Sequence, residues 1–178
     1  MPTLVNAETD ERDALLSFLA AQRGGLRRAV HGLTEEQAAS TPTVSALSLT
    51  VLIKHAARCE RFWIVDNLRG QGADTGRGES DWADEYRLAE GESLAAWLAT
   101  YEQVATETEK IVRELPSLEV DFPLPVAPWF PPNSRRTARW VLLHLIQEAG
   151  RHAGHADIIR ETLDGKTAFE LVDETGAA

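Results

Sequence analysis

The sequence predicts an all-α protein built as a four-helix bundle. Three observations support this fold class: four long segments repeat apolar residues at a spacing of three and four, residues that start or stop helices flank these segments, and no segment alternates convincingly as a strand does. At 178 residues the chain is long enough for one hydrophobic core, so we expect a single domain over residues 1–178.

The first long helix is expected over residues 10–30, where apolar side chains recur on one face and His31 and Gly32 form a plausible stop. The run TEEQ, residues 34–37, has the form of a capping box. It predicts a short further helical turn before the second long helix.

The second long helix is expected from its cap at Ser48 to about Leu68. Its inward face is centred on His55, with Lys54 assigned to one side of that face. A histidine is therefore expected among apolar neighbours in the middle of this helix.

The third long helix begins near Ser93 and carries an extended amphipathic pattern that Pro116 ends. A proline-rich stretch over residues 123–134 follows, and it cannot be helical. We expect it to pack Trp129 and Phe130 over one end of the bundle.

The fourth long helix begins near Ser134 or Thr137 and continues to about Leu163, with Gly165 in the position of a helix stop. The run TAFELV, residues 167–172, is interpreted as a short strand or a packed tail. Together with the three preceding helices, this helix completes the expected bundle.

The stretch HLIQEAGRHAGH, residues 144–155, holds three of the five histidines of the chain. His144, Glu148, His152 and His155 are spaced by four, four and three residues, so they fall in one stripe along the fourth helix. Apolar residues share this stripe, so its imidazoles and carboxylate are expected to face a core, where an unpaired charge is costly. A metal ion is one partner that would offset this cost.

A divalent metal site follows if His55 faces Glu148 and His152 across the bundle interior. Two histidines and a carboxylate are a known ligand set of catalytic zinc, with the fourth position left for water or substrate. The same set suits iron(II), and nickel is also compatible with it. The alternative is that these histidines are hydrogen-bonded core residues without a metal.

Composition and charge exclude several classes of protein. The apolar fraction is 43% and the charged fraction 26%, as in ordinary globular proteins, and no run approaches the roughly 20 apolar residues that span a bilayer. The N-terminal residues lack a basic and apolar leader, so a cytoplasmic location is expected. The net charge of -10 argues against nucleic acid as a partner, and the single cysteine, Cys59, excludes an intramolecular disulfide.

Three runs carry a family resemblance: SLTVLIKHAARCERFW from residue 48, SLAAWLATYEQ from residue 93, and RWVLLHLIQEAGRHAGHADIIRETLDG from residue 139. They resemble the DinB-like superfamily of four-helix metalloproteins, and in particular the branch of mycothiol-dependent maleylpyruvate isomerase and thiol S-transferases. The resemblance extends from residue 48 to Gly165 and so covers most of the chain.

The resemblance implies that His55, Glu148 and His152 are the metal ligands. Many superfamily members have a histidine where this chain has Glu148, whereas the isomerase branch has the same histidine, glutamate, histidine set. The resemblance also implies mycothiol or another low-molecular-weight thiol as co-substrate. The expected function is activation of this thiol by a divalent metal, zinc above all, for transfer to an electrophile or for isomerisation.

An open metal position suits this chemistry. A free thiol of pKa about 8.5 is only a few per cent ionised at about pH 7, and a bound cation lowers the pKa of a coordinated thiol. Two other functions stay open: hydrolysis by metal-activated water, and a non-catalytic metal-binding bundle with a role in stress responses. An apolar strip at a helix end would also allow a homodimer.

The other members of the stripe are assigned separately. His155 lies one turn beyond His152 and is assigned as the group that accepts a proton from substrate, with orientation of a ligand or a structural role as alternatives. His144 is expected to support the site or the core. Cys59, one turn after His55, is expected to behave as a small apolar side chain.

Arg135, Arg136 and Arg139 cluster near the expected start of the fourth helix, where the helix dipole does not favour cations. We expect Arg135 and Arg136 to bind an anionic substrate or a carboxylate of the thiol cofactor. The alternative is a solvated cluster on the surface of an acidic protein.

Overall fold

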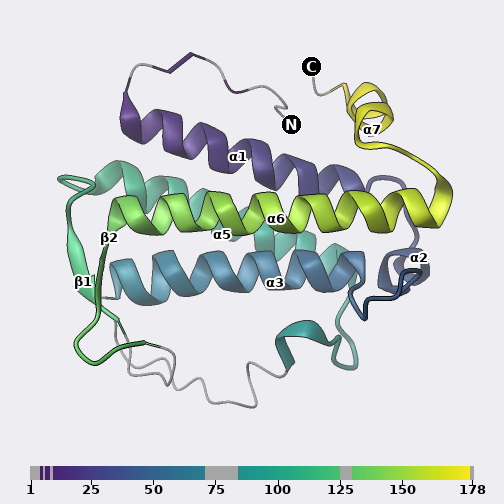
Figure 1. Ribbon diagram of the computed structural model, residues 1–178, viewed down its shortest axis with the longest axis horizontal. Coiled ribbons are helices and arrows are strands. Elements are labelled where there is room, and N and C mark those ends of the chain that lie inside the picture. Colours follow the sequence, from purple (N-terminus) through teal and green to yellow (C-terminus); the bar gives the residue numbers. More distant parts are fainter. Residues whose placement is uncertain (1–4, 6, 9, 71–83, 125–129, 177–178) are drawn as a thin grey trace.

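The computed structural model describes residues 5, 7–8, 10–70, 84–124 and 130–176. Within these ranges the long helices are α1 (Glu11–Ala29), α3 (Leu49–Arg61), α5 (Leu94–Glu114) and α6 (Ala138–Asp164). Figure 1 shows α1, α6 and α3 side by side, with α5 behind them. The prediction of an all-α four-helix bundle is confirmed.

Side chains cap the N-terminus of each long helix by accepting hydrogen bonds from backbone N–H groups of the first turn. The cap expected at Ser48 is present, and Asp10, Ser93 and Thr137 act in the same way. The capping box at Thr34 is also present and begins the short helix α2 (Glu35–Ala39). Residues near each expected boundary thus set where the helices begin.

The second long helix changes its winding after Arg61. A π-helical segment, η1 (Phe62–Arg69), continues it, and the Asn67 Nδ2 atom donates to the Phe62 carbonyl at 2.6 Å. Phe62 and Trp63 are both buried in this segment. The regular period of 3.6 residues does not predict that two consecutive side chains both face the core. The wider turn of a π-helix allows Phe62 and Trp63 to do so.

A short antiparallel ribbon joins β1 (Asp121–Pro123) to β2 (Arg135–Thr137), with Phe122 opposite Arg136. The sequence showed no convincing strand in this region, so the ribbon was not predicted. Strands of three residues are too short to show an alternating pattern. Because Thr137 is also the N-cap of α6, the ribbon fixes the start of that helix.

The chain region TAFELV is helical and is not a strand. Helix α7 (Ala168–Thr175) begins with a capping box between Thr167 and Glu170. Leu171 is its buried residue, and α7 packs against α1. The local capping signal explains the helix, although the run of apolar residues is compatible with either structure.

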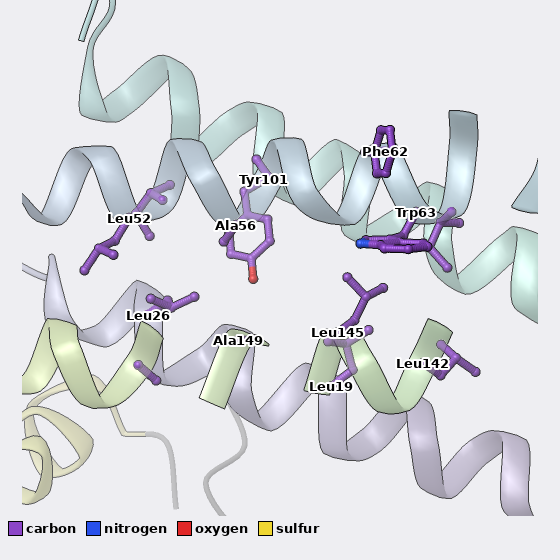
Figure 2. Close-up of a cluster of buried hydrophobic side chains, with 14 of the residues drawn as sticks. Leu19, Leu26, Leu52, Ala56, Phe62, Trp63, Tyr101, Leu142, Leu145 and Ala149 are labelled. Atoms are coloured by element: carbon purple, nitrogen blue, oxygen red, sulfur yellow. The ribbon is translucent and has the colours of Figure 1, made fainter. Parts of the chain in front are cut away.

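The core lies between the long helices, and Figure 2 shows side chains from them converging. Lys54 is an exception to the expected pattern, because it is buried although the sequence analysis placed it beside the inward face. Its Nζ atom donates to the Glu92 carboxylate and to the Arg87 carbonyl, both at 2.7 Å. Within the part of the chain that the structure describes, no helix combines the length and apolar character needed to cross a membrane.

Candidate metal centre

The candidate centre lies where α3 packs against α6. His55 comes from the middle of α3, and Glu148 and His152 lie one turn apart on α6. One potential ligand atom from each residue can be chosen so that all lie within 4.8 Å of one another. The structure therefore brings together the three residues that the sequence analysis named as ligands.

The two imidazole rings meet edge to face, with centroids 4.6 Å apart and planes at 76°. Glu148 Oε2 lies 3.4 Å from His152 Nε2. Among the described residues, no hydrogen-bond partner reaches either ring nitrogen of His55 or Nδ1 of His152. Buried nitrogens without partners are costly, and coordination of a cation would offset that cost. The donor set thus fits a divalent cation such as zinc.

The environment of His152 favours its neutral form. Burial, and then the neighbouring His55, lower the pKa of His152 from 6.5 to about 4, and the Glu148 carboxylate opposes this shift. A neutral imidazole has a free lone pair, which is the form that binds a metal. At neutral pH this residue can therefore act as a ligand without first losing a proton.

Glu85 contacts the centre from outside the ligand set. It lies in the short 3₁₀ helix η2 (Asp84–Tyr86) and is 2% exposed. Its carboxylate lies 3.4 Å from His55 Nδ1, beyond good hydrogen-bond geometry, and 3.2 Å from Arg58 Nε. Tyr86 stacks on the His55 ring at 4.9 Å. A carboxylate beside the second nitrogen of a ligating histidine commonly fixes the ring orientation.

The sequence analysis did not single out Glu85 or Tyr86. They belong to a short turn, so no helical period assigns them to a face. An acidic residue followed by an aromatic one is also too common to mark a site. Only the tertiary structure reveals that this turn covers His55.

A cavity of about 570 Å³ lies beside the centre, within the range of small-molecule sites. Its aromatic wall consists of Phe62, Trp63, Phe130 and Trp140. Its polar lining consists of His55, Cys59, Glu85, Arg136, His144 and Glu148. Phe130 packs against Trp63, as expected for the proline-rich connection, whereas Trp129 lies outside the described residues. Two of the three clustered residues, His55 and Glu148, thus border a space large enough for a small molecule.

The three arginines of the expected cluster have different environments. Arg135 and Arg136 lie on β2 and not on the fourth helix, because α6 begins only at Ala138. Arg135 pairs with Asp121, and Arg139 pairs with Glu11 and Glu119. Arg136 is the member of the cluster that lines the cavity.

The two remaining histidines of the stripe also differ. His144 lies between Trp63 and Trp140, with ring centroids 5.0 and 4.9 Å away, and burial lowers its pKa. His155 is half-buried, and its ring centroid lies 5.6 Å from that of His152. It is not part of the three-residue cluster, so its assignment as a proton acceptor stays a prediction.

The chain matches one protein family and is similar in fold to a known structure. A family model described as mycothiol-S-transferase matches residues 14–165. A crystal structure of a conserved protein from Enterococcus faecalis is similar in fold, with a TM-score of 0.64 and 16% sequence identity over 89% of this chain and 100% of that chain. At this identity the likeness concerns the fold alone. A comparison with curated proteins gave no match.

Proposed function

Because the chain belongs to the mycothiol-S-transferase family, we propose that it is a divalent-metal-dependent enzyme that transfers mycothiol, or a similar low-molecular-weight thiol, to an electrophile. The observation that supports a role for metal is the cluster of His55, Glu148 and His152, whose ligand atoms lie within 4.8 Å of one another. We propose zinc, because two histidines and a carboxylate are one of its catalytic ligand sets. The adjoining cavity offers room for substrates.

A divalent cation held by these three residues would lower the pKa of a coordinated thiol, so that the sulfur reacts as a thiolate at neutral pH. The protein contributes the rest of the environment. Burial keeps His152 neutral, and Glu85 orients His55 through its contact with Nδ1. The aromatic wall of the cavity provides an apolar surface beside His55 and Glu148.

The proposed reaction breaks one bond to hydrogen and one to a leaving group. The thiol loses its proton to solvent or to His155, which lies beside His152. The sulfur then forms a bond to the electrophilic carbon, and the leaving group departs with its bonding electron pair. This chemistry requires little acid and base machinery beyond the thiol activation.

The metal content of the purified protein tests the site. Elemental mass spectrometry should find close to one equivalent of zinc in the wild type and a loss of zinc in His55→Ala and Glu148→Ala. His31→Ala is the matched control, because His31 is exposed and lies after the end of α1. A folded wild type that neither contains nor takes up a divalent metal would contradict the proposed site.

Product analysis tests the reaction. Zinc-loaded protein, a thiol and a chloromethyl electrophile should yield the thioether and chloride, and product formation should need the thiol. Mass spectrometry distinguishes this product from the alcohol that hydrolysis would give. Formation of the alcohol at the same rate without thiol would favour metal-activated water and overturn thiol transfer.

A further inference from the structure

The cavity beside the metal centre has a pronounced aromatic wall. Trp63 lies at its centre, with ring centroids 5.3 Å from Trp140 and 6.1 Å from Phe130. Trp140 remains 38% exposed although His144 stacks on its ring, so part of this residue is accessible to another molecule. Aromatic faces of this kind favour flat, unsaturated ligands.

Arg136 places a cation in the same cavity. Its guanidinium carbon lies 4.7 Å from the centroid of the Trp140 ring, and its Nη1 atom donates to the Arg135 carbonyl at 2.8 Å. Its Nε atom is buried and has no hydrogen-bond partner among the described residues. The neighbouring Arg135 and Arg139, by contrast, are paired with carboxylates. Arg136 therefore keeps donors for an anion from outside the protein.

Helix α6 runs along the cavity between this cation and the proposed metal centre. Trp140, His144 and Glu148 follow one another at successive turns of α6 and all line the cavity. At a rise of about 1.5 Å per residue, Trp140 and Glu148 are about 12 Å apart along the helix axis. Because Arg136 lies over the Trp140 ring, this stretch of α6 leads from the cation to Glu148, and its length is that of one or two aromatic rings.

We propose that this cavity is the electrophile pocket and that it selects aromatic electrophiles carrying a carboxylate. Arg136 binds the carboxylate and determines the specificity, while Trp63 and Trp140 hold the aromatic group. The carboxylates of Glu85 and Glu148 lie with His55 and His152 at the metal end, where they oppose binding of an anion in the reverse orientation. This inference rests on the proposed function, because it assigns the second substrate of the same site.

Equilibrium binding tests the pocket without turnover. The probes are 2-naphthoate and its neutral counterpart 2-naphthamide, titrated by calorimetry into zinc-loaded and zinc-free protein in the absence of thiol. The wild type should bind the carboxylate at least about tenfold more tightly than the amide, with or without zinc, because charge-assisted hydrogen bonds to guanidinium distinguish the two.

Variants of two neighbouring arginines locate the effect. Arg136→Gln should weaken naphthoate binding about tenfold or more and leave naphthamide binding unchanged. The matched variant Arg139→Gln should bind both probes as the wild type does, because Arg139 is paired with Glu11 and Glu119 and does not line the cavity. Arg136→Lys keeps the charge without the planar fork, and it should show an intermediate affinity for naphthoate if Arg136→Gln fails to fold.

Several outcomes would overturn the assignment. Equal affinity of the wild type for the two probes would show that the cavity does not select a carboxylate. Naphthoate binding that requires zinc and ignores Arg136 would place the carboxylate on the metal. The proposed function can fail separately. If the protein bound naphthoate through Arg136 but did not transfer a thiol, the assignment of the pocket would stand and the proposed reaction would not.

Discussion

Glu85 contacts the candidate centre from a short turn that precedes α5. Its carboxylate lies between His55 Nδ1 and the Arg58 guanidinium, so it can fix the orientation of the imidazole. We expect Glu85→Gln to weaken zinc binding about 10- to 100-fold, the usual effect of removing such a partner of a ligating histidine. Competition with a zinc-binding dye would measure the affinity.

The exposed neighbour Asp84 provides the control for this experiment. Asp84→Asn removes one negative charge from the same helical turn without touching His55, so it should bind zinc as the wild type does. Equal zinc affinities of Glu85→Gln and the wild type would rule out a positioning role for Glu85.

His152 makes the stability of the metal-free protein depend on pH. Its pKa is about 4 in the folded protein, below the ordinary value of 6.5. Between these values the unfolded chain binds a proton that the folded protein does not, so stability falls as the pH drops from about 6.5 to 4. Urea unfolding should show that the free energy of unfolding of His152→Gln falls less over this pH range than that of the wild type. A constant difference in stability between the two proteins would contradict this.

The clustering of Glu148 and His152 could be predicted from sequence because helical spacing places them on one face, whereas their role as ligands stays a prediction. Buried charges could not be predicted. Lys54 and Arg160 are each 2% exposed, although charged residues are usually assigned to the surface. Arg160 donates to the carbonyls of Ala29 and His31 at the end of α1, so its burial depends on a helix distant in sequence.

At the scale of elements, α7 shows how a short helix is held by one side chain. Leu171 is 1% exposed, whereas Phe169 on the same helix is 85% exposed. Leu171→Ala should lower the free energy of unfolding by about 2 to 3 kcal/mol, as expected for a cavity in a packed site. Phe169→Ala should change it by less than about 0.5 kcal/mol.

Urea denaturation followed by circular dichroism compares these two variants. If Leu171→Ala were as stable as Phe169→Ala, α7 would contribute little to the folded protein. The contrast matters because the sequence analysis left this segment as either a strand or a packed tail.

Long elements were predicted more reliably than short ones. The four long helices repeat an apolar period many times, and capping residues such as Ser48 and Thr137 mark where they begin. The β1–β2 ribbon and the π-helical segment η1 have no such repetition. Pairing across the ribbon and the Asn67 hydrogen bond determine them instead, and both depend on contacts that a periodic pattern does not encode.

At the scale of the whole molecule, we propose that the chain folds as a single domain. The apolar core is continuous and receives side chains from all four long helices. Thermal unfolding followed by circular dichroism and by tryptophan fluorescence should therefore give one coincident transition. Separate transitions for the two probes would show that parts of the chain unfold independently.

The segment over residues 84–92 contacts α3 twice, at the candidate centre and at an ion pair with Lys54. Glu85 contacts His55 at one end, and Lys54, the neighbour of His55 on α3, holds Glu92 at the other. Zinc binding at His55 should then slow amide hydrogen exchange across this segment. Equal exchange with and without zinc would show that the two ends are uncoupled.

This coupling must act in both directions. Lys54→Met removes the ion pair with Glu92 without changing a proposed ligand, and it should reduce zinc affinity by the same factor by which zinc strengthens the pairing. The buried Lys54 side chain would then regulate the metal affinity of the centre from within the protein. Substitutions at residue 54 would change how tightly the metal is held while every proposed ligand stays in place.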